Sequence, residues 1–178
     1  MGLYWPHAAL AHPHIYADYN VQVTGDSAGI RALHFRFKFD DMYSAIMTSE
    51  MHVQGMPELD TKDTRTVKAA PETFLQGQHF FLYLTADGKT LPPQEIHVTA
   101  AHLGDADTDY LFDFPLPVPA KNIVFSLYDP TYYISVSQMD GEPVKTSPPI
   151  ACTTATKTTS FTIWGLLRAA EVTCVIAP

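Results

Sequence analysis

Two consecutive stretches of alternating apolar and polar residues constrain the fold of this chain more than any other feature. Residues 14–24 place an apolar side chain at every second position, and so do residues 30–39, where the apolar positions are Leu33, Phe35, Phe37 and Phe39. A period of two residues is typical of a β-strand with one buried face. The segment Gly25–Gly29 between them has the composition of a turn. The pattern therefore predicts a β-hairpin.

The residues that follow the hairpin favour a helical insertion. Asp40 and Asp41 can cap a short helix. One stripe of that helix would carry Met42, Ala45, Ile46 and Ser49. A second helix can begin near Pro71, although residues 80–85 fit equally well a strand that ends at the turn Asp87-Gly88.

The second half of the chain is β-patterned. Residues 95–103 and 110–114 flank a turn and predict another hairpin, and further strands are predicted at 123–128, 132–138 and 172–176. Residues 141–160 are rich in Pro, Ser and Thr and are interpreted as a loop. We predict a mainly β protein of the α+β class, an antiparallel β-sandwich with one or two helices inserted after the second strand.

Length and charge exclude several classes of partner. With 178 residues, 46% of them hydrophobic, the chain can bury the core of one domain. Its formal charge of -8 and only 11 Lys and Arg argue against binding to nucleic acid and favour a cationic ligand. No window approaches the roughly 18 consecutive apolar residues of a spanning helix, so we expect no membrane insertion of the mature chain.

The two cysteines and the first residues predict the compartment. Cys152 and Cys174 are either a disulfide or two buried free thiols, and a disulfide requires an oxidising compartment. Ala9-Leu10-Ala11 has the small-x-small pattern that signal peptidase recognises. We expect residues 1–11 to be the remnant of a signal peptide or a segment added in cloning, and residues 12–178 to form one exported, periplasmic domain.

The triplet His12-Pro13-His14 is the strongest candidate for a metal site. If cleavage exposes His12, its α-amine and imidazole can bind one transition-metal ion together with the imidazole of His14. Pro13 has no amide proton to lose, which excludes binding through a deprotonated backbone amide at that position. The alternative is a pair of solvated histidines on an edge strand.

Two further residues are candidate ligands from distant parts of the chain. His79, beside Phe80 and Phe81, is preferred over the remaining histidines. His34 is predicted on a polar face next to Arg36 and Lys38, and His97 and His102 are predicted on opposite faces of one strand. Asp129 either satisfies the backbone of its own turn or binds a metal directly or through a histidine.

An ordered set of motifs resembles a bacterial family known as domain of unknown function 1007, from about His12 to Cys174. The motifs are His12-Pro13-His14, the segment Phe39–Ala45, Asp87-Gly88-Lys89, the segment Tyr128–Tyr133 and the late cysteine pair. The resemblance implies an exported periplasmic component of a transport system, often accompanied by nickel/cobalt-type permeases. Family members often carry a longer acidic helical stretch where residues 51–70 are short and proline-broken here, so a ligand from that region can be missing.

Two functional hypotheses follow. In the first, the protein is a periplasmic metal-binding accessory protein that captures Ni, Co, Zn or Cu through His12, His14, His79 and Asp129. It then supports transport through an inner-membrane metal permease. In the second, it is an envelope interaction module that docks on a permease through strand edges and aromatic residues, without metal. The motifs of serine hydrolases, zinc proteases and nucleotide-binding enzymes are absent from the sequence, and we predict that the protein is not an enzyme.

Overall fold

The first predicted hairpin forms the centre of the larger of two β-sheets. The structure is a computed structural model that describes residues 15–50, 81–92, 97–103, 108–161 and 165–177. Strands β1 (Ile15–Asp26) and β2 (Gly29–Phe39) pair in antiparallel fashion. The alternation seen in the sequence becomes alternating burial along both strands. The hairpin prediction is confirmed.

The larger sheet is completed on both sides of this hairpin. β6 (Thr108–Ala120) pairs with β2, and β5 (His97–Leu103) pairs with β6, which confirms the second predicted hairpin. On the other side, β8 (Ile134–Gln138) and β9 (Val144–Thr146) follow each other along β1. Both pair with β1 in parallel, so the six-stranded sheet is mixed at this edge and antiparallel elsewhere.

The second sheet has five strands in the order β10, β11, β7, β3 and β4. Their bounds are β10 Ile150–Phe161, β11 Gly165–Ile176, β7 Asn122–Leu127, β3 Leu82–Ala86 and β4 Lys89–Leu91. At the predicted turn between β3 and β4, Asp87 and Gly88 have φ angles of 46° and 76°. Positive φ at both positions is the signature of a tight hairpin turn, which Asp-Gly favours.

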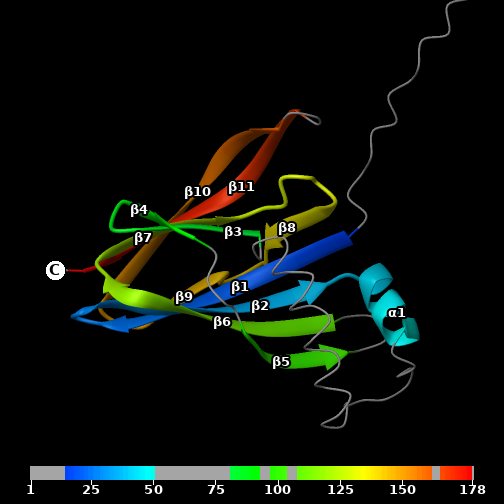
Figure 1. The fold of residues 1–178 in the computed structure, drawn as a ribbon, viewed down its shortest axis with the longest axis horizontal. Coiled ribbons are helices and arrows are strands. Elements are labelled where there is room, and N and C mark those ends of the chain that lie inside the picture. Colours follow the sequence, from blue (N-terminus) through cyan, green and yellow to red (C-terminus); the bar gives the residue numbers. More distant parts are fainter. Residues whose placement is uncertain (1–14, 51–80, 93–96, 104–107, 162–164, 178) are drawn as a thin grey trace, which may run out of the picture.

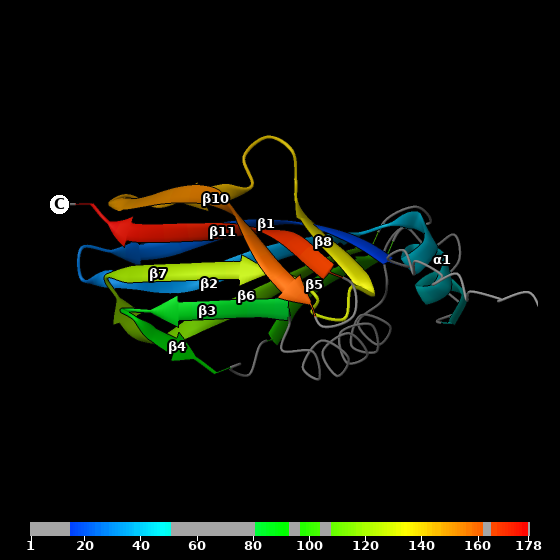
Figure 2. The same cartoon turned by 90° about the horizontal axis from the view of Figure 1, so that it is seen from above.

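The two sheets pack face to face (Figures 1 and 2), and aromatic side chains fill the space between them. The six-stranded sheet contributes most of the rings: Tyr19, Phe35, Phe37, Phe39, Tyr110, Phe112 and Phe114. Phe35 meets Phe125 of the opposite sheet edge-to-face, with ring centroids 6.0 Å apart. Edge-to-face packing is the arrangement that aromatic quadrupoles favour. The structure is therefore the predicted β-sandwich.

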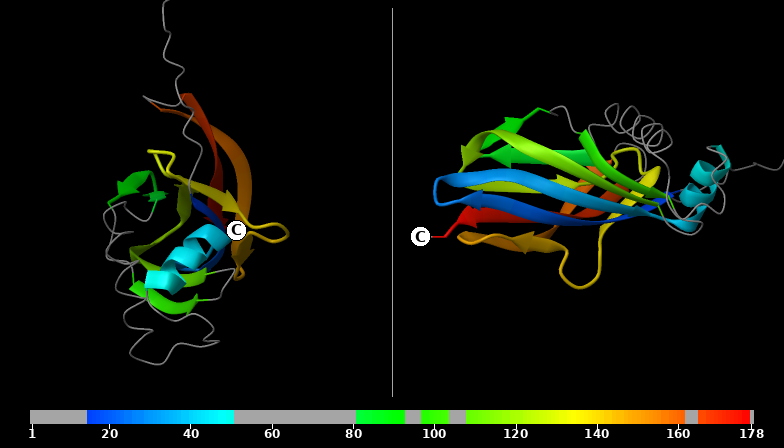
Figure 3. Two further views of the ribbon diagram at one scale, coloured as in Figure 1. Left: turned by 90° about the vertical axis from the view of Figure 1, so that its right-hand side faces the viewer. Right: turned by 90° about the horizontal axis from the view of Figure 1, so that it is seen from below.

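The single helix of the described chain, α1 (Asp41–Glu50), lies at one end of the sandwich (Figure 3). Asp40 caps it, because its Oδ1 accepts a hydrogen bond of 2.8 Å from the Tyr43 N–H. The predicted apolar stripe is wrong: Met42 and Ile46 are exposed, and among the helix side chains that the structure describes Ser44 and Met47 are buried. The cap and the stacking of Tyr43 on Phe39, at 4.3 Å, fix the helix in this rotation. The second predicted helix lies outside the described residues.

The prediction of a loop over residues 141–160 is wrong for the short strand β9 (Val144–Thr146) and for its second half. Residues 150–161 form β10, paired along its whole length with β11. Threonine is β-branched and fits a strand as well as a turn.

β6 also extends past the predicted end at Phe114, through Pro115, Pro117 and Pro119. These prolines are tolerated because, among the residues that the structure describes, β5 pairs with β6 only as far as Asp113 and nothing pairs with that edge of β6 beyond it.

Within the described residues, α1 is far too short to cross a bilayer, and no helix there has the length and hydropathy of a membrane span.

Candidate functional site at the β7–β8 crossover

The connection between β7 and β8 carries the chain from one sheet to the other, and Asp129 holds it in place. Asp129 is 3% exposed. Its Oδ1 accepts hydrogen bonds from the N–H and the hydroxyl of Thr131, at 2.8 and 2.7 Å. Its Oδ2 accepts from the N–H groups of Tyr133 and Ile134, at 3.0 and 2.9 Å. One carboxylate therefore satisfies three backbone donors of the crossover.

This geometry supports the interpretation of Asp129 as the residue that satisfies its own turn. A metal ion bound at Asp129 would have to displace at least one of these hydrogen bonds. Among the residues that the structure describes, no three His, Cys, Asp or Glu side chains are grouped as metal ligands. The role of Asp129 as a ligand stays a prediction.

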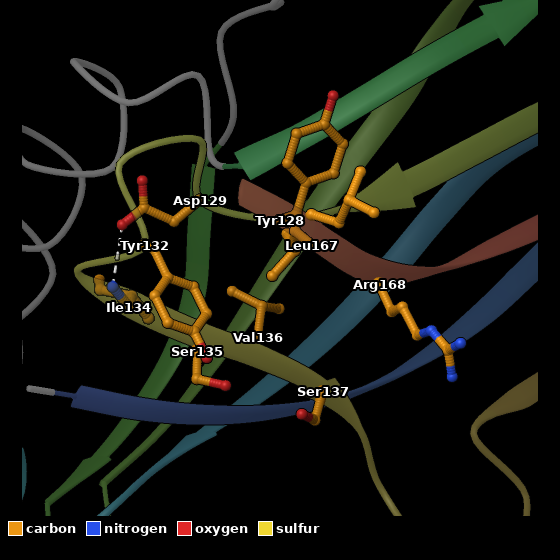
Figure 4. A pocket seen from close by; sticks show the side chains of 10 residues that line it. Tyr128, Asp129, Tyr132, Ile134, Ser135, Val136, Ser137, Leu167 and Arg168 are labelled. Atoms are coloured by element: carbon orange, nitrogen blue, oxygen red, sulfur yellow. Dashed lines mark hydrogen bonds between the residues drawn. The ribbon is translucent and has the colours of Figure 1, made fainter. Parts of the chain in front are cut away.

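A cavity of about 400 Å³ opens beside the crossover, between the free edge of β8 and the first residues of β11 (Figure 4). It is lined by Tyr128, Asp129, Tyr132, Ile134, Ser135, Val136, Ser137, Leu166, Leu167 and Arg168. β7 pairs with β11 only over Glu171–Val175, so β11 extends past the end of β7 along this cavity. The cavity thus lies where the two sheets separate.

Arg168 supplies the cation of the cavity. It lines the cavity from β11 but is itself exposed, and its neighbour Ala169 is buried. Asp129 and Arg168 lie at opposite ends of the cavity, and the guanidinium points away from the carboxylate (Figure 4). Sequence reasoning missed Arg168, because an exposed arginine in a strand carries no signal that distinguishes it from other surface residues.

A second cavity, of about 370 Å³, lies on the outer face of the five-stranded sheet and shares Tyr128 with the first. Tyr128 stacks on Tyr83, with ring centroids 4.1 Å apart and planes inclined by 8°. Burial raises the pKa of Tyr83 to about 12. The Lys157 ammonium and the Glu171 carboxylate, 2.8 Å apart, form an ion pair in the lining of this cavity. Tyr128 therefore stands between an inter-sheet cavity and an outer groove.

The predicted histidine ligands His12, His14 and His79 lie outside the described residues. The described residues nearest to them in sequence, Ile15 and Phe81, lie beside the crossover. Ile15, which follows His14, lies opposite Ile134 in the parallel pairing of β1 with β8. Phe81, two residues after His79, accepts a hydrogen bond of 3.0 Å at its carbonyl from the Tyr128 N–H.

The histidines of the six-stranded sheet differ in part from expectation. His34 lies on the polar face, as predicted, where Nδ1 is 2.7 Å from Asp113 Oδ1 and Nε2 is 3.1 Å from Thr24 Oγ1. The prediction that His97 and His102 occupy opposite faces of β5 is wrong. An irregularity between Val98 and Ala100 inserts one residue, so His97 lies opposite Asp113 and His102 opposite Asp109. Since Asp109 and Asp113 are four residues apart, both positions fall on one face.

The fold and crossover define a disulfide-containing β-sandwich with one described helix. Residues 1–162 match the family described as protein of unknown function, DUF1007, and the chain belongs to this family. No curated protein matches the chain. Among solved structures, it is similar to AChBP from Bulinus truncatus, at 9% identity and a TM-score of 0.41, over 96% of this chain and 90% of that one. That likeness is too distant to inform function.

Proposed function

We propose that this protein is a periplasmic metal-binding accessory protein. It captures a divalent transition-metal ion (Ni, Co, Zn or Cu) as cargo and supports its transport by an inner-membrane permease. In this proposal the protein binds and transfers the ion and is not an enzyme. The ligands are His12, His14 and His79, with Asp129 as a further ligand or as the acceptor that orients one imidazole.

One observation carries the proposal. The chain enters the described fold at Ile15 and again at Phe81, and both residues adjoin the crossover that Asp129 organises. Consecutive Cα atoms are only about 3.8 Å apart. The described residues nearest in sequence to His14 and His79 thus lie beside Asp129, and this proximity supports the proposal.

Two further properties are consistent with this function. The formal charge of -8 attracts cations. The Cys152–Cys174 disulfide is stable in an oxidising compartment such as the periplasm. Imidazole ligands suit zinc, copper and nickel, whereas an all-oxygen site would suit Mg²⁺ or Ca²⁺.

Calorimetric titration of the full chain with Ni²⁺, Co²⁺, Zn²⁺ and Cu²⁺ tests the proposal. We expect the His12→Ala/His14→Ala variant to lose at least about tenfold in affinity for the preferred ion, which corresponds to ~1.4 kcal/mol. His102→Ala is the matched control, because it removes an exposed imidazole from β5, at the opposite edge of the six-stranded sheet from β8. Equal affinities in the wild type and the double variant would contradict the proposal.

A second function is favoured by exposed apolar side chains at the same end. Tyr16 and Tyr133 are 53% and 50% exposed, and Leu166, in the cavity lining, is 75% exposed. Exposed apolar side chains of this kind fit an interaction module that docks on a permease without metal. Equal recovery of the permease in chelator and in added metal would favour this alternative, whereas loss of the complex in chelator would favour the metal-binding function.

A further inference from the structure

β10 is a free sheet edge without the features that usually protect such edges. It is an outermost strand of the five-stranded sheet, 12 residues long, and its pairing with β11 runs without a bulge. Residues 153–158 are all exposed, and the strand contains no proline. Its one charged residue, Lys157, is paired with Glu171 of its own sheet at 2.8 Å. Natural edges are normally protected by charges, prolines or bulges.

The disulfide shows which backbone groups of β10 face outward. Directly opposite residues of antiparallel strands have Cα atoms about 5.5 Å apart when they exchange hydrogen bonds and about 4.5 Å apart when they do not. Cys152 and Cys174 are opposite each other with Cα atoms 4.1 Å apart. This pair is therefore not hydrogen-bonded. The N–H and C=O groups of Cys152, Thr154, Thr156 and Thr158 thus point away from β11, toward the free edge.

The sequence of this edge is nearly symmetric about Thr156. Residues 153–159 read Thr-Thr-Ala-Thr-Lys-Thr-Thr, with threonine at equal distances on both sides of the centre. A two-fold symmetric interface requires this kind of self-complementarity, since each residue meets its counterpart from the other copy.

We propose that β10 pairs antiparallel with β10 of a second copy of this chain, about a two-fold axis through Thr156. Thr156 then lies opposite Thr156 of the other copy, and Thr154 lies opposite Thr158. Each of these pairs joins groups that face the free edge, and each can exchange two backbone hydrogen bonds. The two five-stranded sheets become one continuous sheet.

Side chains in this register are compatible as well. Threonine opposite threonine is a favourable cross-strand pair. Lys157 lies opposite Ala155, so the two lysines do not face each other, and each keeps Glu171 as its partner. An isologous contact uses both copies of the edge and closes on itself, which yields a dimer and not a filament. Because edge pairing alone buries little apolar surface, we expect half-dimerisation at roughly 0.1 mM.

Sedimentation of the full chain, with lysine or aspartate substituted at position 156, tests the proposal. Thr156→Lys and Thr156→Asp each place like charges opposite each other across the axis, and each should sediment as a monomer where the wild type dimerises. An equimolar mixture of the two should recover the dimer, which a folding defect could not produce. Thr90→Lys, on the edge strand β4 at the other side of the sheet, is the matched control and should dimerise like the wild type.

Amide hydrogen exchange of the wild type provides a test that needs no variant. In dilute protein the Thr154, Thr156 and Thr158 amides should exchange fast, while those of Ala155 and Lys157, bonded to β11, should be slow. At concentrations where the protein dimerises, hydrogen exchange of the Thr154, Thr156 and Thr158 amides should slow, while exchange of the Ala155 and Lys157 amides should not change. A monomer at every concentration up to about 1 mM, or dimerisation that both Thr156 variants retain, would overturn the proposal. A monomeric chain whose β10 amides are protected only by another protein's strand would overturn it too.

Discussion

Cys152 and Cys174 lie directly opposite each other on neighbouring antiparallel strands, and their sulfur atoms are bonded. Cys174 is fully buried. The bond confirms the disulfide that the sequence left as one of two alternatives. It attaches the edge strand β10 to β11, whose other neighbour, β7, belongs to the centre of the sheet.

We expect the disulfide to be a large contributor to stability. It closes a loop with a sequence separation of 22 residues, for which the chain-entropy relation gives about 3 kcal/mol. The Cys152→Ala/Cys174→Ala variant should lose this amount of unfolding free energy in urea denaturation. Thr153→Ala/Thr173→Ala, at the next opposed pair along the same strands, should lose less than about 1 kcal/mol. Equal losses in both variants would contradict the prediction.

The crossover should depend strongly on the Asp129 carboxylate. Asp129→Ala leaves the N–H groups of Thr131, Tyr133 and Ile134 without their acceptor, which should cost about 3 kcal/mol of unfolding free energy. Asp129→Asn keeps one acceptor oxygen and should cost roughly half as much. Asp140→Asn, at an exposed site in the following loop, is the control and should change stability by less than about 0.5 kcal/mol. Stability of Asp129→Ala equal to that of the control would show that the carboxylate does not hold the crossover.

The sequence predicted the sandwich because both central strands carry an alternation with no competing interpretation. The sequence-based prediction failed for elements whose pattern of side chains is not determined by burial. β10 is exposed on both faces around Thr156, so selection for core residues leaves no alternation there, and the threonines were interpreted as a loop. The rotation of α1 was also missed, because the Asp40 cap on the Tyr43 N–H and the stacking of Tyr43 on Phe39 set it together.

The candidate site was predictable only in part. Asp129 was found because Asp-Pro between two strands is a turn signal. The inter-sheet cavity and Arg168 depend on β11 extending past the end of β7, a difference in strand length that no local pattern encodes. The arrangement of His97 and His102 was unpredictable for a similar reason. One inserted residue in β5 brings both positions to the same face, and no local pattern encodes that insertion.

The structure distinguishes the two aspartates that begin α1. Asp40 accepts from the Tyr43 N–H through Oδ1, at 2.8 Å, and from the Tyr16 N–H through Oδ2, at 2.7 Å, so it joins the helix to β1. Asp40→Ala should destabilise the protein by about 2 kcal/mol in urea denaturation. Asp41→Ala, one residue further on, loses only an interaction with the helix dipole, worth about 0.5 kcal/mol. The reverse order of the two losses would show that Asp41 is the cap.

The stability of the protein should fall at alkaline pH because of its buried tyrosines. Tyr19 is 1% exposed, and burial raises its pKa to about 12 from 10.0. Between these two values the unfolded chain releases the phenolic proton and the folded chain retains it. The contribution of Tyr19 is therefore complete below pH 10 and is lost as the pH rises to about 12, by at most ~3 kcal/mol. Burial also raises the pKa of Tyr110, which adds to the fall.

Tyr19→Phe isolates this effect. The hydroxyl of Tyr19 is close to Gln138, but the two groups do not meet in hydrogen-bonding geometry, so the Oη is buried without a hydrogen-bond partner among the described residues. Removing an unpaired buried hydroxyl costs no hydrogen bond, and we expect equal or greater stability at neutral pH. Denaturant unfolding at a series of pH values should show a shallower alkaline fall in Tyr19→Phe than in the wild type, with the remaining slope due to Tyr110. Superimposable pH profiles would show that Tyr19 ionises equally readily in the folded and unfolded chain, and that its hydroxyl is in contact with water.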